Sequence, residues 1–446
     1  MSLTLTPPDK MADKQSTDQW FASAPLTESS VDLPDWYQQI QASSWEQFCE
    51  NGGPTRLDQN WRFADLKKVR LSGLLPAPEV DSASSVERAL RNRLEAFAAH
   101  FVFVNNRLVH SETGSLPEGV ICLPINEALA KHSDLVQSYF LKEEGCLGGS
   151  KFRQIHAAAS LSGVFVHVPR GVICEDPILV NHFVGGDSST IFPHTLIVAD
   201  DNTSVSVMDT FQSIQENEET YAIGNVDLHA NNGANLQYVA FEDASDTGAK
   251  HVQLNSSKAG RDSSIKSAFV NLGAAWVRNE SINHMADSGA DCQIYSANLA
   301  NGIQEYDQRT LQVHEAQHTT SDLLFKNALY DNARTIFSGL IQVLPGSHHT
   351  DSYQTCRNLL GSKAAEANAM PGLEIDADQV KCSHGSTSGQ ISDEEIFYLQ
   401  ARGITAEDAR RIISLGFLNE TVSRLDCDNL KEFLFSRIER KFASLA

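Results

Sequence analysis

Cys382 and His384 are the two residues of this chain whose types and spacing most favour chemistry. They lie in the stretch 380–390, which continues an extended pattern that begins at residue 375. On an extended backbone, residues two apart project from the same face. A thiolate beside an imidazole can ligate a soft metal, or can act as a nucleophile with its base. Taken alone, the pair more often means a packed cysteine next to a surface histidine, because most free cysteines are buried, so its surroundings must decide.

Three other groups of reactive residues stand in less favourable contexts. Asp200 and Asp201 form an acidic pair, but adjacent residues in a turn are usually solvated. His314 and His318 would share one face on a helix, whereas their segment has the pattern of a strand and a turn. The histidine pair at 348–349 falls in a polar turn. These groups are therefore weaker candidates than the pair at 382 and 384.

This sequence contains no phosphate-binding loop motif. The glycine-rich run at 145–149 lacks the Lys-Ser/Thr of such a loop at the required spacing, and no other segment supplies it. We therefore expect that the chain does not hydrolyse ATP itself.

Composition excludes several classes of protein. The net charge of −22 over 446 residues argues against binding to a nucleic-acid backbone, which needs clustered lysine and arginine. No apolar run reaches the length that crosses a bilayer, and the start has no signal pattern, so we expect a cytoplasmic protein. The eight cysteines are scattered without a Cys-x-x-Cys pair, as in a reduced compartment without disulfides or structural zinc.

Strand-like runs recur between residues 163 and 390 and position the candidate pair. They begin about every 29 residues, each after a polar turn, which is a period typical of stacked repeats. The runs begin at Leu236, Ile265, Gln293, Asp322 and Ser352, and Val380 continues the series. Such repeats bury their inward residues only by stacking on their neighbours. We therefore predict a parallel β-helix over 163–390, with a β-sandwich of short strands as the alternative.

The remainder of the chain divides into three regions. Residues 1–30 are polar and are predicted to form a disordered tail. Residues 31–162 are predicted to be mostly helical, with a helix over 86–100 whose apolar stripe includes Leu94 and Phe97, and with a small hairpin around Asn105-Asn106. Residues 391–446 have helical patterns that follow a capping box at 392–395. These last helices either cap the β-helix or dock a partner, and the sequence favours neither.

Several motifs resemble the SufD subunits of the SufB/SufD family of iron–sulfur cluster assembly scaffolds. The motifs lie at 339–343, 350–354, 358–360, 373–375, 382–385 and 397–404, with Pro54-Thr55-Arg56 and Trp61 near the start. The Cys-x-His-Gly at 382–385 resembles SufD, whereas SufB carries an acidic residue after the histidine. The chain departs from the family pattern at 370–372, at 377–379 and at Ser388. The resemblance covers the chain from about Asp32 to its end.

This resemblance implies a fold, partners and site residues. It implies a right-handed parallel β-helix flanked by helical regions, pairing of the terminal turns with SufB, and binding of the ATPase SufC through the C-terminal helices. His384 matches the interface histidine and Cys382 the neighbouring cysteine. A transient iron–sulfur cluster would form there in the complex, with no cofactor held tightly by this chain alone. Candidate contacts with the ATPase, or with a cap, are Phe397, Tyr398, Leu399, Arg402, Leu430 and Phe433.

The sequence thus favours a non-enzymatic scaffold subunit over two alternatives. One alternative is a carbohydrate-active β-helix enzyme, which would need converging carboxylates. The other is a purely structural partner that stabilises SufB without touching iron. Whether two copies pair in the absence of SufB is left open. Neutral imidazole and thiolate are the ligating forms, so we expect cluster loading to weaken as the pH falls below about 6.5.

Overall fold

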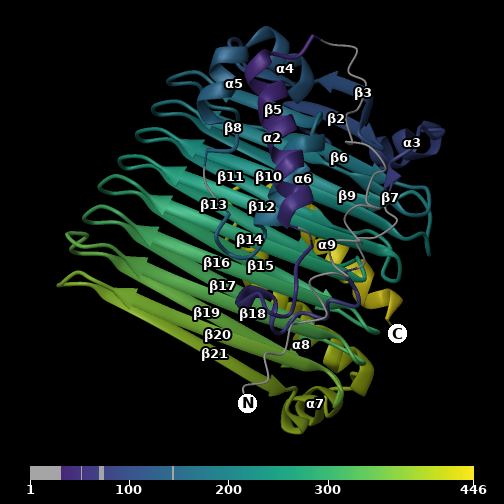
Figure 1. Cartoon of the computed structure of the whole chain (residues 1–446). Helices are drawn as coiled ribbons and strands as arrows, with labels where there is room; N and C mark the ends of the chain where they lie inside the picture. The colour runs from purple at the N-terminus through teal and green to yellow at the C-terminus, as the bar shows by residue number, and fades with distance from the viewer. Residues whose placement is uncertain (1–31, 52, 70–74, 143–144, 446) are drawn as a thin grey trace, which may run out of the picture.

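The computed structural model describes residues 32–51, 53–69, 75–142 and 145–445. Its centre is a parallel β-solenoid of about 8 turns, and each turn contributes strands to two facing sheets (Figure 1). This confirms the predicted mainly β, parallel β-helix class. The predicted disordered tail at 1–30 lies outside the described residues. In the described ranges no helix is both long and apolar enough to cross a membrane.

The two sheets alternate along the chain. Sheet A contains β4 (Ile121–Pro124), β5 (Ser162–Val168), β8 (Pro193–Ala199), β10 (Thr220–Ala230), β12 (Ala249–Ala259), β14 (Trp276–Met285), β16 (Glu305–His314), β18 (Arg334–Val343) and β20 (Glu366–Ile375), with the short β1 (Leu75–Pro76) and β7 (Ser189–Ile191) at its side. Sheet B contains β3 (Arg107–Thr113), β2 (Ala99–Val104), β6 (Ile178–Val184), β9 (Ser204–Ser213), β11 (Asn235–Glu242), β13 (Ser264–Asn271), β15 (Asp291–Ala300), β17 (Thr320–Leu329), β19 (Asp351–Leu360) and β21 (Lys381–Gln390).

A left-handed backbone residue stands two positions before each sheet B strand from β9 to β21. These residues have φ between 53° and 79° and are Asn202, Gly233, Asp262, Gly289, His318, His349 and Gln379. Glycine, asparagine and aspartate adopt this conformation at the lowest cost, which explains why the turns are polar. The predicted polar turns are confirmed.

The predicted strand register is correct for three of the five runs. Ile265 pairs with Leu236, as predicted. The strand starts predicted at Gln293 and Asp322 are each one residue late. The residues that stack in register on Ile265 in the next two sheet B strands are Cys292 and Ser321. The error arises because the step from Ile265 to its partner Cys292 is 27 residues, shorter than the expected spacing of about 29.

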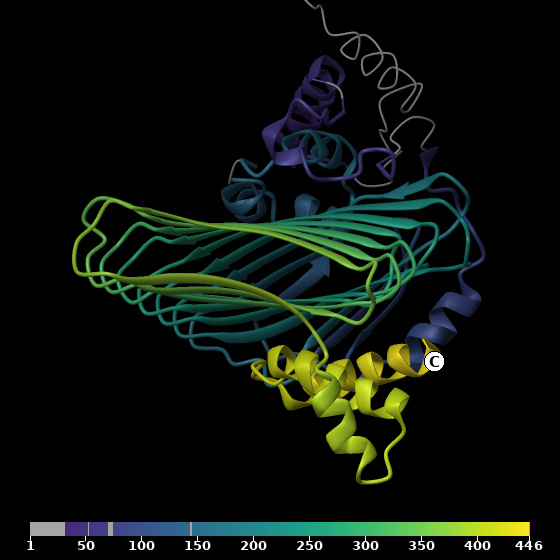
Figure 2. The ribbon, with the colours of Figure 1, turned by 90° about the horizontal axis from the view of Figure 1, so that it is seen from below.

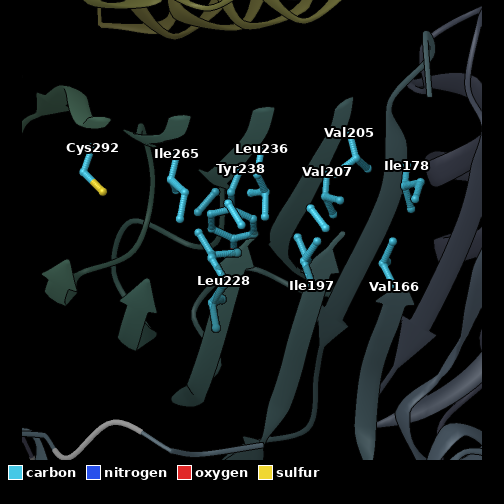
Figure 3. Packing of buried hydrophobic residues seen from close by; sticks show 14 of the residues in the cluster. Val166, Ile178, Ile197, Val205, Val207, Leu228, Leu236, Tyr238, Ile265 and Cys292 are labelled. Carbon is cyan, nitrogen blue, oxygen red and sulfur yellow. The ribbon is translucent and has the colours of Figure 1, made fainter. Parts of the chain in front are cut away.

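The solenoid interior changes character along its axis. In the early turns it is apolar, with side chains such as Val166, Val205 and Leu236 directed into the space between the sheets (Figure 3). In the last turns the buried inward positions include Ser352 and Gln354. Burial of neutral polar groups requires internal hydrogen bonds, so the last turns depend on their side-chain pairing more than the first turns do.

The N-terminal region covers the outer face of sheet A and the first end of the solenoid. Its helices are α2 (Asp35–Asn51), the 3-10 turn η1 (Gln59–Trp61), α3 (Ala83–Arg91), α4 (Ile125–Lys131), α5 (Ser133–Tyr139) and α6 (Ser150–Ala159). The hairpin of β2 and β3 is confirmed, with Asn105 and Asn106 both at positive φ. β2 also pairs with β6, so the hairpin extends sheet B.

One predicted helix in this region is too long. The pattern at 86–100 indicated a helix throughout, but α3 ends at Arg91 and β2 begins at Ala99. Leu94 and Phe97 are nonetheless buried, in a cluster with residues of sheet B and of the C-terminal helices. Tertiary packing of these two side chains explains their apolar spacing without a helix.

Arg278 fastens the N-terminal region to sheet A. Its fully buried guanidinium pairs with Asp307 at 2.5 Å and donates to Glu280 at 2.7 Å. The same group donates to the backbone oxygens of Asn60 and Leu147 and lies 3.8 Å from the centre of the Trp61 ring. Trp61 is therefore a core residue, and each charge of the cluster is compensated.

The C-terminal helices lie on the opposite face of the solenoid. They are α7 (Asp393–Gln400), α8 (Ala406–Val422) and α9 (Asp428–Ser444). The predicted capping box is confirmed, since Ser392 accepts a hydrogen bond from the Glu394 amide and Glu395 accepts one from the Ser392 amide. α8 and α9 pack across the outer face of sheet B, and the last turn of the solenoid stays uncovered (Figure 2). These two helices are therefore not a cap on the terminal turn.

Candidate functional site

The last turn of the solenoid leaves two strand edges open. Within the described part of the chain, β20 pairs only with β18, and β21 pairs only with β19. Each open strand is 10 residues long. Long open edges present backbone N–H and C=O groups that can pair with another strand. Pro371 removes one N–H from β20, which leaves β21 as the more regular edge.

Cys382 and His384 lie on the inward face of this open turn. Cys382 is in register with Ser352, and His384 is in register with Gln354. Gln354 donates a hydrogen bond at 3.2 Å to the Gly339 oxygen on β18, across the interior of the solenoid. The side chain of Gln354 therefore points inward. Residues in register on neighbouring parallel strands point to the same side. The prediction that Cys382 and His384 share one face is therefore confirmed, and the structure adds that this face is the interior.

The two side chains differ in exposure. His384 is exposed, whereas Cys382 is half-buried. Burial and the nearby charge of Asp351 raise the pKa of the Cys382 thiol above its usual value. The thiol is therefore protonated at neutral pH, and a bound cation would have to displace that proton.

These two residues form an incomplete ligand set. No group of three or more His, Cys, Asp and Glu side chains could hold a metal ion among the residues that the structure describes. The inward neighbours in register, Ser352 and Gln354, carry a hydroxyl and an amide. A soft metal or cluster bound here would need further ligands from another molecule.

A ladder of asparagines supports the inner wall beside the site. Asn271, Asn298, Asn327 and Asn358 are stacked in register on β13 to β19. Each donates its amide N–H to the side-chain oxygen of the next, at 2.6 Å for the first link and 2.7 Å for the other two. The last donates to Ser388 on the open strand at 3.1 Å. This ladder was not predicted from the sequence, although the recurrence of asparagine at the strand repeat was a signal.

The N-terminal half of the predicted partner surface is exposed. On α7, Phe397 is 71% exposed and Tyr398 is 58% exposed. The Arg402 guanidinium lies 3.5 Å from the centre of the Tyr398 ring and donates to its backbone oxygen at 2.9 Å. Leu399 is half-buried. Two adjacent exposed aromatic residues are unusual on a free surface and are typical of an interaction site.

The other half of that surface lies inside the molecule. Leu430 is fully buried, in the cluster that joins α9 to sheet B. Phe433 is half-buried and packs edge-on against Phe241 with ring centres 5.8 Å apart. Apolar periodicity identifies a buried face but does not name what covers it. In this chain the covering surface is the outer face of sheet B, so Leu430 and Phe433 are core contacts.

The histidine and aspartate groups that were the weaker candidates for a site make structural contacts in the folded chain. His314 is buried inside the solenoid, where its ring contacts the hydroxyls of Thr319 and Ser321, whereas His318 is exposed in the turn. His318 stacks on His349 with ring centres 4.7 Å apart. Asp200 contacts the His167 ring at 3.0 Å. The structure therefore does not bring His314 and His318 together.

The fold and the site define this chain as a parallel β-solenoid protein whose last turn is open and carries an inward cysteine and histidine. A family model described as SUF system FeS cluster assembly, SufBD core domain, matches residues 182–417, and one described as SufBD protein N-terminal region matches residues 27–180. The chain belongs to the SufBD family of iron–sulfur cluster assembly proteins.

Curated relatives agree with this assignment. The iron–sulfur cluster assembly protein SufD of Escherichia coli (strain K12) is 28% identical over 440 residues, which cover 94% of this chain and 98% of that protein. The protein of the same name from Bacillus subtilis (strain 168) is 29% identical over 326 residues, covering 73% of this chain and 74% of that protein. A SufBD family protein of Synechocystis, slr0076, is 25% identical over 390 residues, covering 85% of each chain.

Proposed function

We propose that this chain is a non-enzymatic scaffold subunit on which an iron–sulfur cluster is assembled between the open turn and a SufB partner. The observation that carries the proposal is the inward pair Cys382 and His384 on a strand with one unpaired edge. A half-set of soft ligands at an open edge is completed when another chain joins that edge. The cluster is then the cargo of the complex and is held by neither subunit alone.

Strand pairing gives the geometry of the complex. The terminal turn of a SufB solenoid would extend both sheets and continue the interior columns of side chains. Cys382 and His384 would then lie between two turns, shielded from water, instead of on an open end. Ser388, at the end of the asparagine ladder, would acquire a neighbour in the same way.

The exposed aromatic pair on α7 is the proposed contact for the ATPase SufC. Phe397 and Tyr398 project from the helix that directly follows β21, so a motor bound there would act on the strand that carries Cys382 and His384 (Figure 1). Phe397→Ala should weaken capture of SufC by at least about tenfold, because exposed aromatic anchors dominate many interfaces. Ile412→Ala, at an exposed aliphatic position on α8, is the matched control and should leave capture unchanged.

The alternatives differ in their support. The matched families and the relatives named above are all cluster-assembly proteins, so they give no support to a carbohydrate-active enzyme. A purely structural subunit has the same fold and the same partner edge. Only ligation of iron by Cys382 and His384 distinguishes the proposed scaffold from a purely structural subunit.

The test is anaerobic reconstitution with iron and sulfide, followed by absorption spectroscopy and iron counting. It is run on this chain alone, on this chain with SufB and SufC, and on complexes that contain His384→Ala or Cys382→Ser. Matched controls are His349→Asn, in an exposed turn, and Cys146→Ser, at an exposed cysteine. Iron that binds only in the complex and is lost with His384→Ala supports the proposal.

Two other outcomes contradict it. Full cluster binding by this chain alone would mean that its own ligand set is complete. Unimpaired loading in the His384→Ala and Cys382→Ser complexes would establish the purely structural role.

A further inference from the structure

A column of alternating charge on the outer face of sheet A ends at the open strand β20. Glu305, Arg334 and Glu366 stand in register on β16, β18 and β20. Arg334 pairs with Glu305 at 3.6 Å and with Glu366 at 3.5 Å. Glu305 also accepts a hydrogen bond from the Asp65 amide of the N-terminal region, which covers this face. The Glu305 side chain is buried, whereas that of Glu366 is 58% exposed, so the alternation stops at a carboxylate on the open edge.

A second carboxylate lies near the other end of the same strand. Glu374 is exposed, and the neutral side chain of Gln342 donates a hydrogen bond to it at 3.2 Å. β20 contains two glutamates and no lysine, arginine or histidine. Among the described residues, the only cation paired with either glutamate is Arg334, which Glu366 shares with Glu305. The outer face of β20 therefore carries incompletely compensated negative charge at both ends.

The inward face of β20 is aliphatic and only partly covered. Leu373 and Ile375 are in register with Ile341 and Val343 of β18. The two β18 side chains are fully buried, whereas Leu373 is half-buried and Ile375 is 39% exposed. Aliphatic side chains that end a buried column lose contact with water when a further turn covers them, which is favourable. This face of β20 therefore suits a partner with aliphatic residues at the same inward positions.

The other open strand, β21, differs from β20 in both respects. Its inward face carries Cys382 and His384, and no aliphatic residue occurs anywhere in the strand. Lys381 is the only lysine, arginine, aspartate or glutamate of β21, and it stands in register with Asp351. β21 thus offers possible ligands, whereas β20 offers charge and apolar surface. The two strands of the open turn divide ligation from recognition.

We propose that β20 is the strand by which the partner turn is recognised. This inference rests on the proposed SufB complex and adds the chemistry of the partner strand, which carries lysine or arginine on its outer face beside Glu366 and Glu374, and aliphatic residues on its inner face. Opposite charges on neighbouring strands attract, whereas like charges directly opposite each other repel. Complementary charge of this kind gives specificity and speeds association. A turn with acidic outer positions is rejected by the same strand.

The test is the affinity of the full chain for SufB, measured without iron at low and at high chloride concentration. Glu374 has no ion pair among the described residues, and Glu374→Lys should weaken binding by at least about fivefold at low chloride. Glu366→Lys should act in the same direction. Both effects should shrink as chloride screens the charges. The matched control is Glu118→Lys, at an exposed position between β3 and β4 at the far end of the solenoid, and it should stay within about twofold of wild type.

The dependence on chloride separates charge recognition from a folding defect. A misfolded last turn would weaken binding at every chloride concentration, and so should Ile375→Ser, because apolar contacts are not screened. The inference is overturned if both glutamate variants bind as wild type, if Glu118→Lys weakens binding as much as they do, or if chloride leaves their effect unchanged. A wild-type chain that does not bind SufB would contradict the proposed complex, and this inference with it. Because no iron is present, these results are independent of the reconstitution test.

Discussion

His384 lies beside Gln354 in the register of β21 and β19, yet Gln354 is 1% exposed whereas His384 is exposed. The two residues occupy equivalent inward positions in successive turns of the solenoid. Their difference in burial arises because β21 has a neighbouring strand on one side only. Pairing with a further strand would therefore change the environment of His384 more than that of any residue in the turn below it.

The backbone of β21 should report this pairing through hydrogen exchange. In the free chain, the β21 amides that point away from β19 should exchange rapidly, because they lack a strand partner. Addition of SufB should slow them by at least about tenfold, while β15 in the middle of sheet B stays protected throughout. Unchanged exchange in β21 within a stable complex would show that SufB docks elsewhere.

Iron loading of the complex should become stronger as the pH rises. Because burial and Asp351 raise the pKa of Cys382, its thiol keeps the proton near neutral pH and must release it on ligation. Apparent iron affinity should therefore rise by up to about tenfold per pH unit across neutral pH, and Cys382→Ser should flatten this dependence. Anaerobic iron titration of both complexes at two pH values measures it. An equal slope in the variant would mean that Cys382 does not ligate.

The asparagine ladder should contribute strongly to stability. Asn327→Leu removes the acceptor of one Asn298 N–H and the strongest donor to the Asn358 oxygen, which keep only Ser296 and the Cys356 thiol as partners, so the two buried losses together should cost about 1–3 kcal/mol. The midpoint of urea unfolding should fall accordingly. Ser388→Ala, at the exposed end of the same ladder, should cost less than about 1 kcal/mol. Equal effects of the two substitutions would argue that the ladder is not a cooperative unit.

His314 should make the solenoid sensitive to acid. Burial lowers its pKa to about 4, so the folded chain binds fewer protons than the unfolded chain between about pH 6.5 and pH 4. Its contribution is complete above the unfolded pKa and is lost as the pH falls through this window. Urea unfolding should show that wild type loses about 2 kcal/mol more than His314→Gln between pH 7 and pH 5. His318→Asn, at an exposed position, should behave as wild type.

Local periodicity by itself determined much of the fold. Polar turns of similar spacing predicted the repeat, because left-handed residues at each turn must tolerate positive φ. The alternation of a strand placed Cys382 and His384 on one face, because that relationship involves only neighbouring residues. The capping box at Ser392 likewise depends on contacts within one turn of helix.

Tertiary structure decided which surfaces those local patterns meet. The pattern that marked Leu430 as apolar could not distinguish a partner from the outer face of sheet B, which covers it. The apolar spacing at Leu94 and Phe97 indicated a helix, although distant packing, not helical periodicity, accounts for it. The Arg278 guanidinium joins Asn60, Leu147 and Asp307, residues that no local pattern relates. Burial depends on contacts between segments far apart in the chain, and the sequence alone does not record those contacts.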